Sequence, residues 1–499
     1  RTRLLGSRHD AEGAHAPDTQ PRAGHADDVV DGGALEARDH PEHLRHGYLC
    51  RCDLHRGMPM DLAFASTAIA AREAAPVKAL PDKLIMQGPK EVTMHQVGHT
   101  LGLRHNFKAS TWRPLADMND TGKTAEGGLV ASGMDYSPAN IAAPDETQGD
   151  YYSTTIGPYD VWAIEYGYKR LSGGTDGEVK ELEKIAARST EPELDYATDE
   201  DTRGIDADPL SNRFDLGADP LADARKRAEL IAELWPGVVE RMTEEGDGYQ
   251  QARRAFGVLL GQHGRAVFFA SRFVGGVYVH RDHKGEGSRA PYEVVDANKQ
   301  REALALLEEQ LFSDEPFDFP PELYNHLAAS HWRHWGTGYS DRSDYAVHEV
   351  IGMWQDRVLS QLLSSVTLER LHDSELKVSA DEDAFTAAEL IQRLTHAIFA
   401  EADGIESADY SNRKPAVSSL RRNLQRIYLR RLSDIALGNR SAPDDCQTIA
   451  FVELDDLRSR IEQSLEGDVS LDDYSRAHLR ESAARIEKVL DARLELPSP

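Results

Sequence analysis

Three histidines in one short run constrain this 499-residue chain more than any other feature. The run is His95-Gln96-Val97-Gly98-His99-Thr100-Leu101-Gly102-Leu103-Arg104-His105. Residues four apart share one face of a helix, so His95 and His99 can present two imidazoles to one ion. Gly102 can take the positive φ that ends a helix abruptly, which lets the chain fold back and bring His105 to the same ion. Three protein ligands and one open position define a catalytic Zn²⁺ site rather than a structural one.

Apolar periodicity places this run on the second of two N-terminal helices. Met58 to Ala75 have nearly continuous apolar, helix-forming character, and a second helical pattern runs from Pro81 to Gly102. Beyond residue 170, six further segments have apolar and charged positions at helical spacing. These segments are Leu221 to Leu234, Gln300 to Leu311, His348 to Leu363, Ala387 to Ala400, Leu420 to Leu437 and Leu454 to Leu465.

The acidic composition excludes two classes of partner. The chain has 57 Lys and Arg against 85 Asp and Glu, a formal net charge of −28. Such a field repels polyanions, so neither nucleic acid nor an anionic membrane surface is an expected partner. The most apolar stretch, Gly257 to Val279, contains charged side chains, so we expect no membrane-spanning helix. An odd number of cysteines supports neither a disulfide framework nor a four-thiolate zinc site; they are Cys50, Cys52 and Cys446.

Residues 1–55 differ from the rest of the chain. They contain many histidines but no Lys, Ile or Phe, so they cannot form a packed core. A His-rich metal-binding tail is one interpretation. The irregular His spacing instead favours disorder, or a stretch translated from a mis-assigned reading frame. The chain begins at Arg1 without a secretion-signal pattern, from which we expect that the true start or the signal is missing.

A second element, Ser132-Gly133-Met134-Asp135-Tyr136, follows the His run in a turn-forming context. Together the two elements resemble the metzincin metalloproteases, whose motif H-E-x-x-H-x-x-G-x-x-H is followed by a Met-turn. The resemblance implies that His95, His99 and His105 bind Zn²⁺ and that Met134 forms a hydrophobic floor beneath the metal. In some members a tyrosine at the position of Tyr136 approaches the zinc or the developing oxyanion.

The sequence around these elements is similar to that of large bacterial zinc-dependent metalloproteases with an EcxA-type zinc-binding domain. The similar segments are Lys90 to Ser110, Tyr159 to Tyr168 and Val274 to His283, and the resemblance covers roughly residues 57–400. It implies hydrolysis of internal bonds in a protein or peptide substrate, in the periplasm or outside the cell. It also implies that the sheet forming the upper wall of the family's cleft is mostly absent. Oligomeric state stays open.

These observations predict an α+β chain that is predominantly α-helical. Residues 1–55 form a disordered or mis-translated tail, and residues 56–170 form a metzincin-like catalytic module without most of its N-terminal sheet. Residues 171–330 form a helical extension that packs over the cleft. Residues 331–499 form a C-terminal helical region.

Position 96 departs from the family pattern, because Gln96 stands where the family has Glu. In the family that carboxylate polarises the zinc-bound water, accepts its proton and passes the proton to the leaving amine. A neutral amide cannot do so, and losing a general base costs roughly 10²- to 10⁴-fold in rate. Glu91, one turn before His95, is expected to point away from the open position and to be a surface or capping acid.

Several explanations of Gln96 stay open at this point. The chain is a weak enzyme, or it is a pseudoprotease that binds zinc and peptides without turnover. A sequencing error at codon 96 is the third explanation, because Glu and Gln codons differ at one base. A purely structural helical protein, in which the three histidines fall in register by chance, is the alternative to any metal site.

Three other polar clusters favour non-catalytic interpretations. The cluster at residues 280–283 is typical of a solvated loop end rather than a second metal site. The run at residues 331–335 indicates interhelical packing with polar tips. The acidic loop at residues 199–204 begins like a calcium loop, but Arg203 and Leu210 occupy positions that need oxygen ligands.

Overall fold

The computed structural model describes residues 54–72, 80–202, 206–330 and 342–492. Helices dominate this part of the chain, and its one sheet has two antiparallel strands, β1 (Val277–Val279) and β2 (Tyr292–Val294). Val277 pairs with Val294, and Val279 pairs with Tyr292. The predicted class, α+β with helix predominant, is confirmed.

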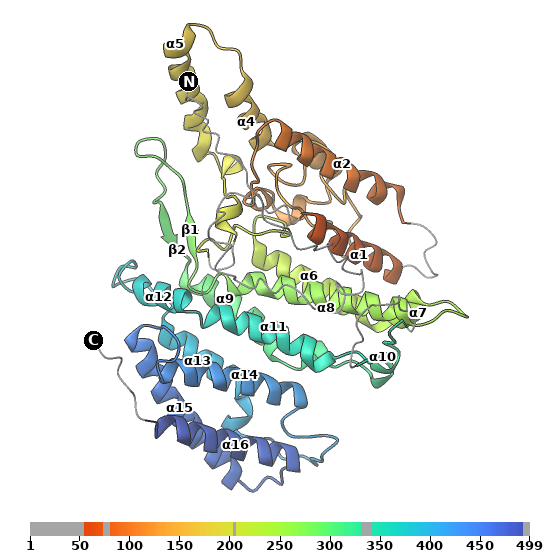
Figure 1. Ribbon diagram of the computed structural model, residues 1–499, viewed down its shortest axis with the longest axis vertical. Coiled ribbons are helices and arrows are strands. Elements are labelled where there is room, and N and C mark those ends of the chain that lie inside the picture. The colour runs from red at the N-terminus through yellow and green to blue at the C-terminus, as the bar shows by residue number, and fades with distance from the viewer. Residues whose placement is uncertain (1–53, 73–79, 203–205, 331–341, 493–499) are drawn as a thin grey trace, which may run out of the picture.

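The elements form successive tiers along the long axis of the molecule (Figure 1). Helices α1 (Leu54–Arg72) and α2 (Asp82–Thr100) lie towards one end, near α4 (Pro158–Tyr168) and α5 (Gly174–Ala186). The blue C-terminal helices lie at the other end. Three short α-helices lie in the connections, among several 3-10 turns; they are α3 (Thr121–Gly127), α7 (Val238–Met242) and α10 (Pro321–Asn325).

The two predicted N-terminal helices are present, and α2 ends where the sequence predicts. Gly102 has a φ of +87°, a left-handed conformation that glycine adopts without steric cost. The Leu103 amide donates to the Gly98 carbonyl at 3.1 Å, and the Gly102 amide donates to the His99 carbonyl at 3.0 Å. This pair of bonds is a Schellman motif, which satisfies the last carbonyls of the helix and reverses the chain.

The middle tier is built around α8 (Gln250–Ser271), the long helix that contains most of the chain's most apolar stretch. Phe256, Leu259 and Val267 of α8 are fully buried. The helix packs against α1 and against α6 (Pro220–Leu234), α9 (Ala297–Leu307) and α11 (Val347–Leu362). No helix of the described ranges combines the length and apolar character that crossing a membrane requires.

The C-terminal tier consists of α12 (Ser365–Ser374), α13 (Ala387–Ile398), α14 (Ser419–Ala436), α15 (Asp444–Glu466) and α16 (Asp473–Leu490). Buried apolar side chains from Phe64 in α1 to Ile486 in α16 belong to one connected core. The predicted boundaries after residues 55, 170 and 330 stay predictions.

Most predicted helices begin and end within three residues of the observed bounds. Three differ more. Helix α1 begins at Leu54 rather than Met58, α15 begins at Asp444 rather than Leu454, and α9 changes at Glu308 into a π-helical segment, Glu308–Phe312. Predictions for residues 1–53 and for the run at 331–335 lie outside the described residues.

Candidate metal centre

The structure brings the three predicted histidines to one point. His95 and His99 lie one turn apart on α2, and the turn at Gly102 returns His105 to them. The three potential ligand nitrogens all lie within 4.8 Å of one another. His95 Nε2 and His99 Nε2 are 3.1 Å apart. His95 and His105 are buried, and His99 is half-buried.

The Nδ1 atom of each imidazole lies at an oxygen that can only accept a hydrogen bond. His95 Nδ1 donates to the Gly133 carbonyl at 2.9 Å, and His99 Nδ1 donates to the Leu103 carbonyl at 3.0 Å. His105 Nδ1 lies 2.8 Å from Asp199 Oδ2. Because Nδ1 carries the proton, Nε2 of each neutral ring presents a lone pair to the shared point.

The arrangement fits a divalent metal ion. Two Nε2 lone pairs that face each other at 3.1 Å repel unless a cation lies between them. Neutral imidazoles are also the form that binds a metal. Burial lowers the pKa of His95 to about 4, and the charges of His105 and His99 add to the effect. A set of three imidazoles that converge on one point suits Zn²⁺.

Met134 forms the floor of this centre by packing against the α2 backbone between its two histidines. A Cβ added to Gly98 would collide with the Met134 sulfur. The turn is tied to α4, because the Gly133 amide donates to Asp160 Oδ2 at 2.7 Å. The backbone amide of Asn106 donates to the Met134 carbonyl at 3.2 Å, which joins the turn to the segment after His105.

Tyr136 is fully buried with its hydroxyl at the histidine cluster. The Tyr136 hydroxyl lies 3.0 Å from His105 Nε2, so it donates to that lone pair. Its ring contacts Phe107 and Phe214, with ring centroids 5.0 and 5.6 Å away. Phe214 has a φ of +67°, a conformation that costs energy for a bulky residue and persists only where its surroundings impose it. The Phe214 amide donates to the Tyr136 carbonyl at 2.9 Å.

Gln96 lies on the exposed side of α2, between the two histidines of that helix. Its amide has no hydrogen-bond partner within the described ranges, so it can bond to a molecule that enters the site. It therefore occupies the predicted position without a carboxylate's ability to accept a proton.

The interpretation of Glu91 as a surface or capping acid is wrong. Its side chain is buried, because residues four apart share a face and His95 lies on the inward face of α2. The carboxyl lies near Ser137 and the backbone of Ser153, and burial raises its pKa to about 8. One carboxyl oxygen has no hydrogen-bond partner among the described residues.

Asp199 is the residue of the centre that the sequence did not reveal. It begins the acidic run that resembles the start of a calcium loop, yet its carboxylate accepts from His105 Nδ1 at 2.8 and 3.0 Å. Arg213 Nη2 lies 3.4 Å from Asp199, and Arg104 lies 3.9 Å away. Burial would raise the pKa of Asp199, but His105 and the two guanidinium groups lower it below its usual value. A carboxylate on the far nitrogen fixes the tautomer and orientation of a metal-ligating imidazole.

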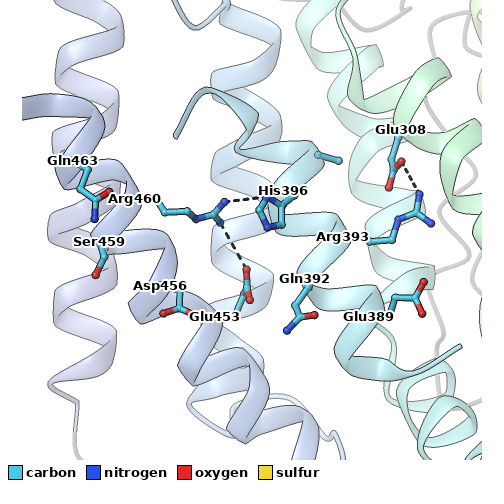
Figure 2. Close-up of a pocket in the computed structure, with 11 residues that line it drawn as sticks. Glu308, Glu389, Gln392, Arg393, His396, Glu453, Asp456, Ser459, Arg460 and Gln463 are labelled. Carbon is cyan, nitrogen blue, oxygen red and sulfur yellow. Dashed lines mark hydrogen bonds and ion pairs between the residues drawn. The ribbon is translucent and has the colours of Figure 1, made fainter. Parts of the chain in front are cut away.

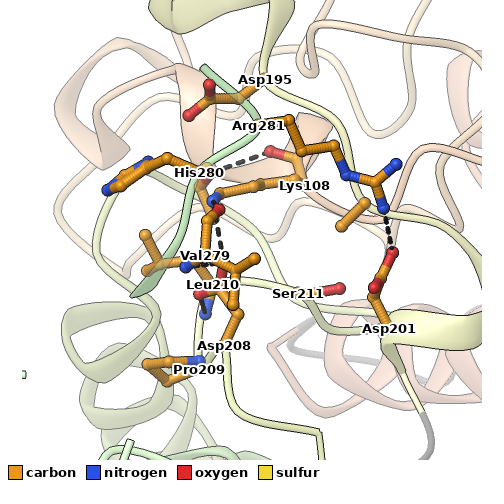
Figure 3. Close-up of polar contacts among 12 residues, drawn as sticks. Lys108, Asp195, Asp201, Asp208, Pro209, Leu210, Ser211, Val279, His280 and Arg281 are labelled. Atoms are coloured by element: carbon orange, nitrogen blue, oxygen red, sulfur yellow. Dashed lines mark hydrogen bonds and ion pairs between the residues drawn. The ribbon is translucent and has the colours of Figure 1, made fainter. Parts of the chain in front are cut away.

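The segment after His105 is anchored to distant parts of the chain (Figure 3). Lys108 is buried, and its ammonium donates to Asp208 Oδ2 at 2.8 Å and to the Val279 carbonyl at 2.9 Å. The Val279 amide donates to the same Asp208 oxygen at 3.2 Å. The Phe107 amide donates to the Ala197 carbonyl at 2.7 Å. The third histidine thus depends on contacts with the loop around residue 208 and with β1.

The cluster at residues 280–283 does not converge on one point. His280 contacts Glu293 at 3.3 Å and His283 contacts Glu286 at 2.9 Å. Asp282 accepts from Arg289 at 2.6 Å. Within the described ranges, the three histidines of the metal centre are the one group of three or more His, Cys, Asp or Glu side chains whose ligand atoms lie close enough to hold a metal ion.

Comparison with known proteins gives one finding. A family model described as Met-zincin matches residues 78–404. No curated protein and no solved structure matches the chain. The matched range begins just before α2 and ends after α13, so it covers the metal centre, residues 171–330 and part of the C-terminal helical region.

Proposed function

Because the chain belongs to the Met-zincin family, a family of zinc metallopeptidases, we propose that it binds Zn²⁺ and an extended peptide, and that it cleaves internal peptide bonds only slowly. The observation that carries this proposal is that three Nε2 lone pairs converge on one point. The hydrogen bond that each Nδ1 makes holds its ring in the orientation that aims Nε2 there.

His95, His99 and His105 would hold the ion. When bound, Zn²⁺ supplies Lewis acidity towards a carbonyl oxygen and lowers the pKa of water towards neutrality. The other steps of the reaction depend on side chains of this protein. Those side chains bind the peptide, hold or move protons, and stabilise the charge that develops on the substrate oxygen.

Tyr136 is positioned for the last of these roles. Its hydroxyl proton now bonds to His105 Nε2 at 3.0 Å. Once that lone pair is engaged as a ligand, the hydroxyl must find another acceptor. A substrate oxygen at the cluster is such an acceptor, and a hydroxyl donor preorganised by packing stabilises an oxyanion. The rings of Phe107 and Phe214 hold the tyrosine ring in place for this bond.

Among the described residues of α2, neither position 96 nor Glu91 supplies a carboxylate to receive the proton that the attacking water must lose. Gln96 is neutral, and Glu91 is buried on the inward face of α2 beside Ser137 and Ser153. This placement favours a second candidate function, a pseudoprotease that binds zinc and peptides without turnover. For either function we propose a location outside the cytoplasm, as the family resemblance implies.

Metal content and proteolysis, measured together, test the proposal. We expect purified protein incubated with Zn²⁺ and desalted to retain one zinc per chain, and His99→Ala to lose it. We expect labelled casein to be cleaved slowly or not at all, and any cleavage to stop with 1,10-phenanthroline. A native chain that retains no zinc would overturn both candidate functions.

A further inference from the structure

A groove remote from the metal centre lies between α13 and α15, beside the π-helical segment. Its volume is about 930 Å³, within the range of sites that bind small ligands. Polar side chains from both helices and from the π-helical segment point into it (Figure 2). In Figure 1 these helices lie at the end of the molecule opposite α2.

The charges on the α13 side of the groove cancel within the protein. Arg393 of α13 donates to Glu308 at 2.8 Å. Glu389 accepts two bonds from Arg301, at 2.6 and 2.9 Å. Because each carboxylate on this side already has a guanidinium partner, this wall does not select the sign of a ligand's charge.

The α15 side differs, because its carboxylates outnumber its available cations. Arg460 donates to Asp403 at 2.6 Å, so its charge is already matched. Arg460 Nη2 also forms an ion pair with Glu453 at 3.7 Å, a separation beyond hydrogen-bond distance. Its Nη2 is buried without a hydrogen-bond partner among the described residues. The Glu453 side chain is only 9% exposed, and Asp456, at the mouth of the groove, is exposed.

Glu453 and Asp456 form a like-charge pair on one face of a helix. Residues three apart on a helix are neighbours, and like charges at such spacings are destabilising. Burial raises the pKa of Glu453, and the charge of Asp456 adds a smaller increase. Arg460, Thr395 and His396 oppose the rise of this pKa. A cation placed between these two carboxylates would offset both the repulsion and the cost of burying the Glu453 charge.

We propose that this groove binds a basic peptide segment, with a lysine ammonium or arginine guanidinium group between Glu453 and Asp456. Arg460 Nη2 is a buried donor that suits a backbone carbonyl oxygen of the peptide. The amides of Gln392 and Gln463 line the same groove and can bond to its other backbone groups. The net charge of −28 attracts cationic ligands. This site does not depend on the proposed peptidase activity.

Calorimetric titration of the full chain at physiological salt tests the proposal. The probes are Ac-Lys-Ala-Lys-NH₂, the charge-reversed Ac-Glu-Ala-Glu-NH₂, and cadaverine, which carries two ammonium groups but no peptide. We expect the lysine peptide to bind with a stoichiometry of one, the glutamate peptide not to bind, and cadaverine to bind more weakly than the lysine peptide.

Matched variants separate this site from general attraction to an acidic protein. Glu453→Gln with Asp456→Asn should raise the Kd of the lysine peptide about tenfold or more, because both charge-assisted bonds are lost. Asp455→Asn with Glu462→Gln removes the same charge from the same helix, at two acids that instead contact Arg458. This control pair should leave the Kd unchanged.

Three results would overturn the proposal. They are no saturable binding of the lysine peptide, an equal loss of affinity in the groove and control variants, and cadaverine binding as tight as that of the peptide. Because Glu453 is buried, circular dichroism should confirm that its variant folds. Asp456→Asn alone, at an exposed position, repeats the test if the double variant does not fold.

Discussion

The sulfur of Met134 packs against the α-carbon of Gly98, in the turn of α2 that separates His95 from His99. No side chain fits between them, so the Met-turn and the helix are in direct contact. The glycine in the middle of the histidine motif is therefore a packing requirement of the centre.

Gly98→Ala should destabilise the protein and weaken zinc binding. Overpacking a buried contact by one methyl group costs about 1–3 kcal/mol, and the displaced Met134 would move the Met-turn that holds His95 through the Gly133 carbonyl. Urea denaturation and zinc competition with a chromogenic chelator measure the two effects.

Gly261→Ala is the control for Gly98→Ala, because a Cβ there meets nothing within 4 Å in the middle of α8. It should stabilise the protein by roughly 0.5–1 kcal/mol. Gly98→Ala combined with Met134→Ala should lose less stability than the sum of the two single changes, since residues in contact couple. Full additivity of the two changes would contradict the packing argument.

Asp199→Ala should lower zinc affinity by about 10- to 100-fold, the usual cost of losing the partner of a metal-ligating imidazole. Asp199→Asn should have a smaller effect, because its amide oxygen can still accept from His105 Nδ1. Chelator competition and cobalt absorption spectra follow the affinity and geometry of the site. Glu200→Gln is the neighbouring control, because Glu200 bonds to Arg104 at the surface. Equal zinc affinity in Asp199→Ala and the native chain would show that His105 is oriented by other contacts.

Gln96→Glu should raise the rate of casein cleavage by roughly 10²- to 10⁴-fold, because it restores a general base. Zinc content should not change, since Gln96 is not among the converging ligands. Val97→Glu adds the same charge at an exposed neighbour and should not raise the rate. A native chain that cleaves as fast as Gln96→Glu would place the base elsewhere.

Glu91→Gln should change the dependence of stability on pH. Burial raises the pKa of Glu91 to about 8 from a usual value of 4.5, so between these values the folded protein holds a proton that the unfolded chain releases. Stability from this group is therefore present at low pH and lost as the pH rises towards 8. The variant removes that loss and should be more stable than the native chain at pH 8, by an amount on the order of 3 kcal/mol.

Urea denaturation at pH 5 and pH 8 measures this effect. The gain from Glu91→Gln should be present at pH 8 and small at pH 5. Glu126→Gln, at an exposed position in α3, serves as the control and should not alter the pH profile. A larger gain at pH 5 than at pH 8 would contradict the raised pKa.

Local patterns were enough to predict α1, α2 and the turn at Gly102. Helical periodicity and the conformational freedom of glycine act within a few residues, so a sequence shows them directly. Asp199 could not be found in this way. It is 94 residues from His105, and its acidic neighbours resemble only the start of a calcium loop. Glu91 was misjudged for a related reason, since the partners that bury it, Ser137 and Ser153, come from distant loops.

The anchoring of the segment after His105 also bears on how the metal centre forms during folding. That segment is held through Ala197, Asp199, Asp208 and Val279, far along the chain from α2. Closing such long loops must precede the final orientation of the third imidazole, and long-range contacts of this kind slow folding. A nascent chain that ends before these residues would offer the ion two ligands on α2 without the contacts that orient the third. Tight metal capture would then mark the completion of folding rather than its beginning.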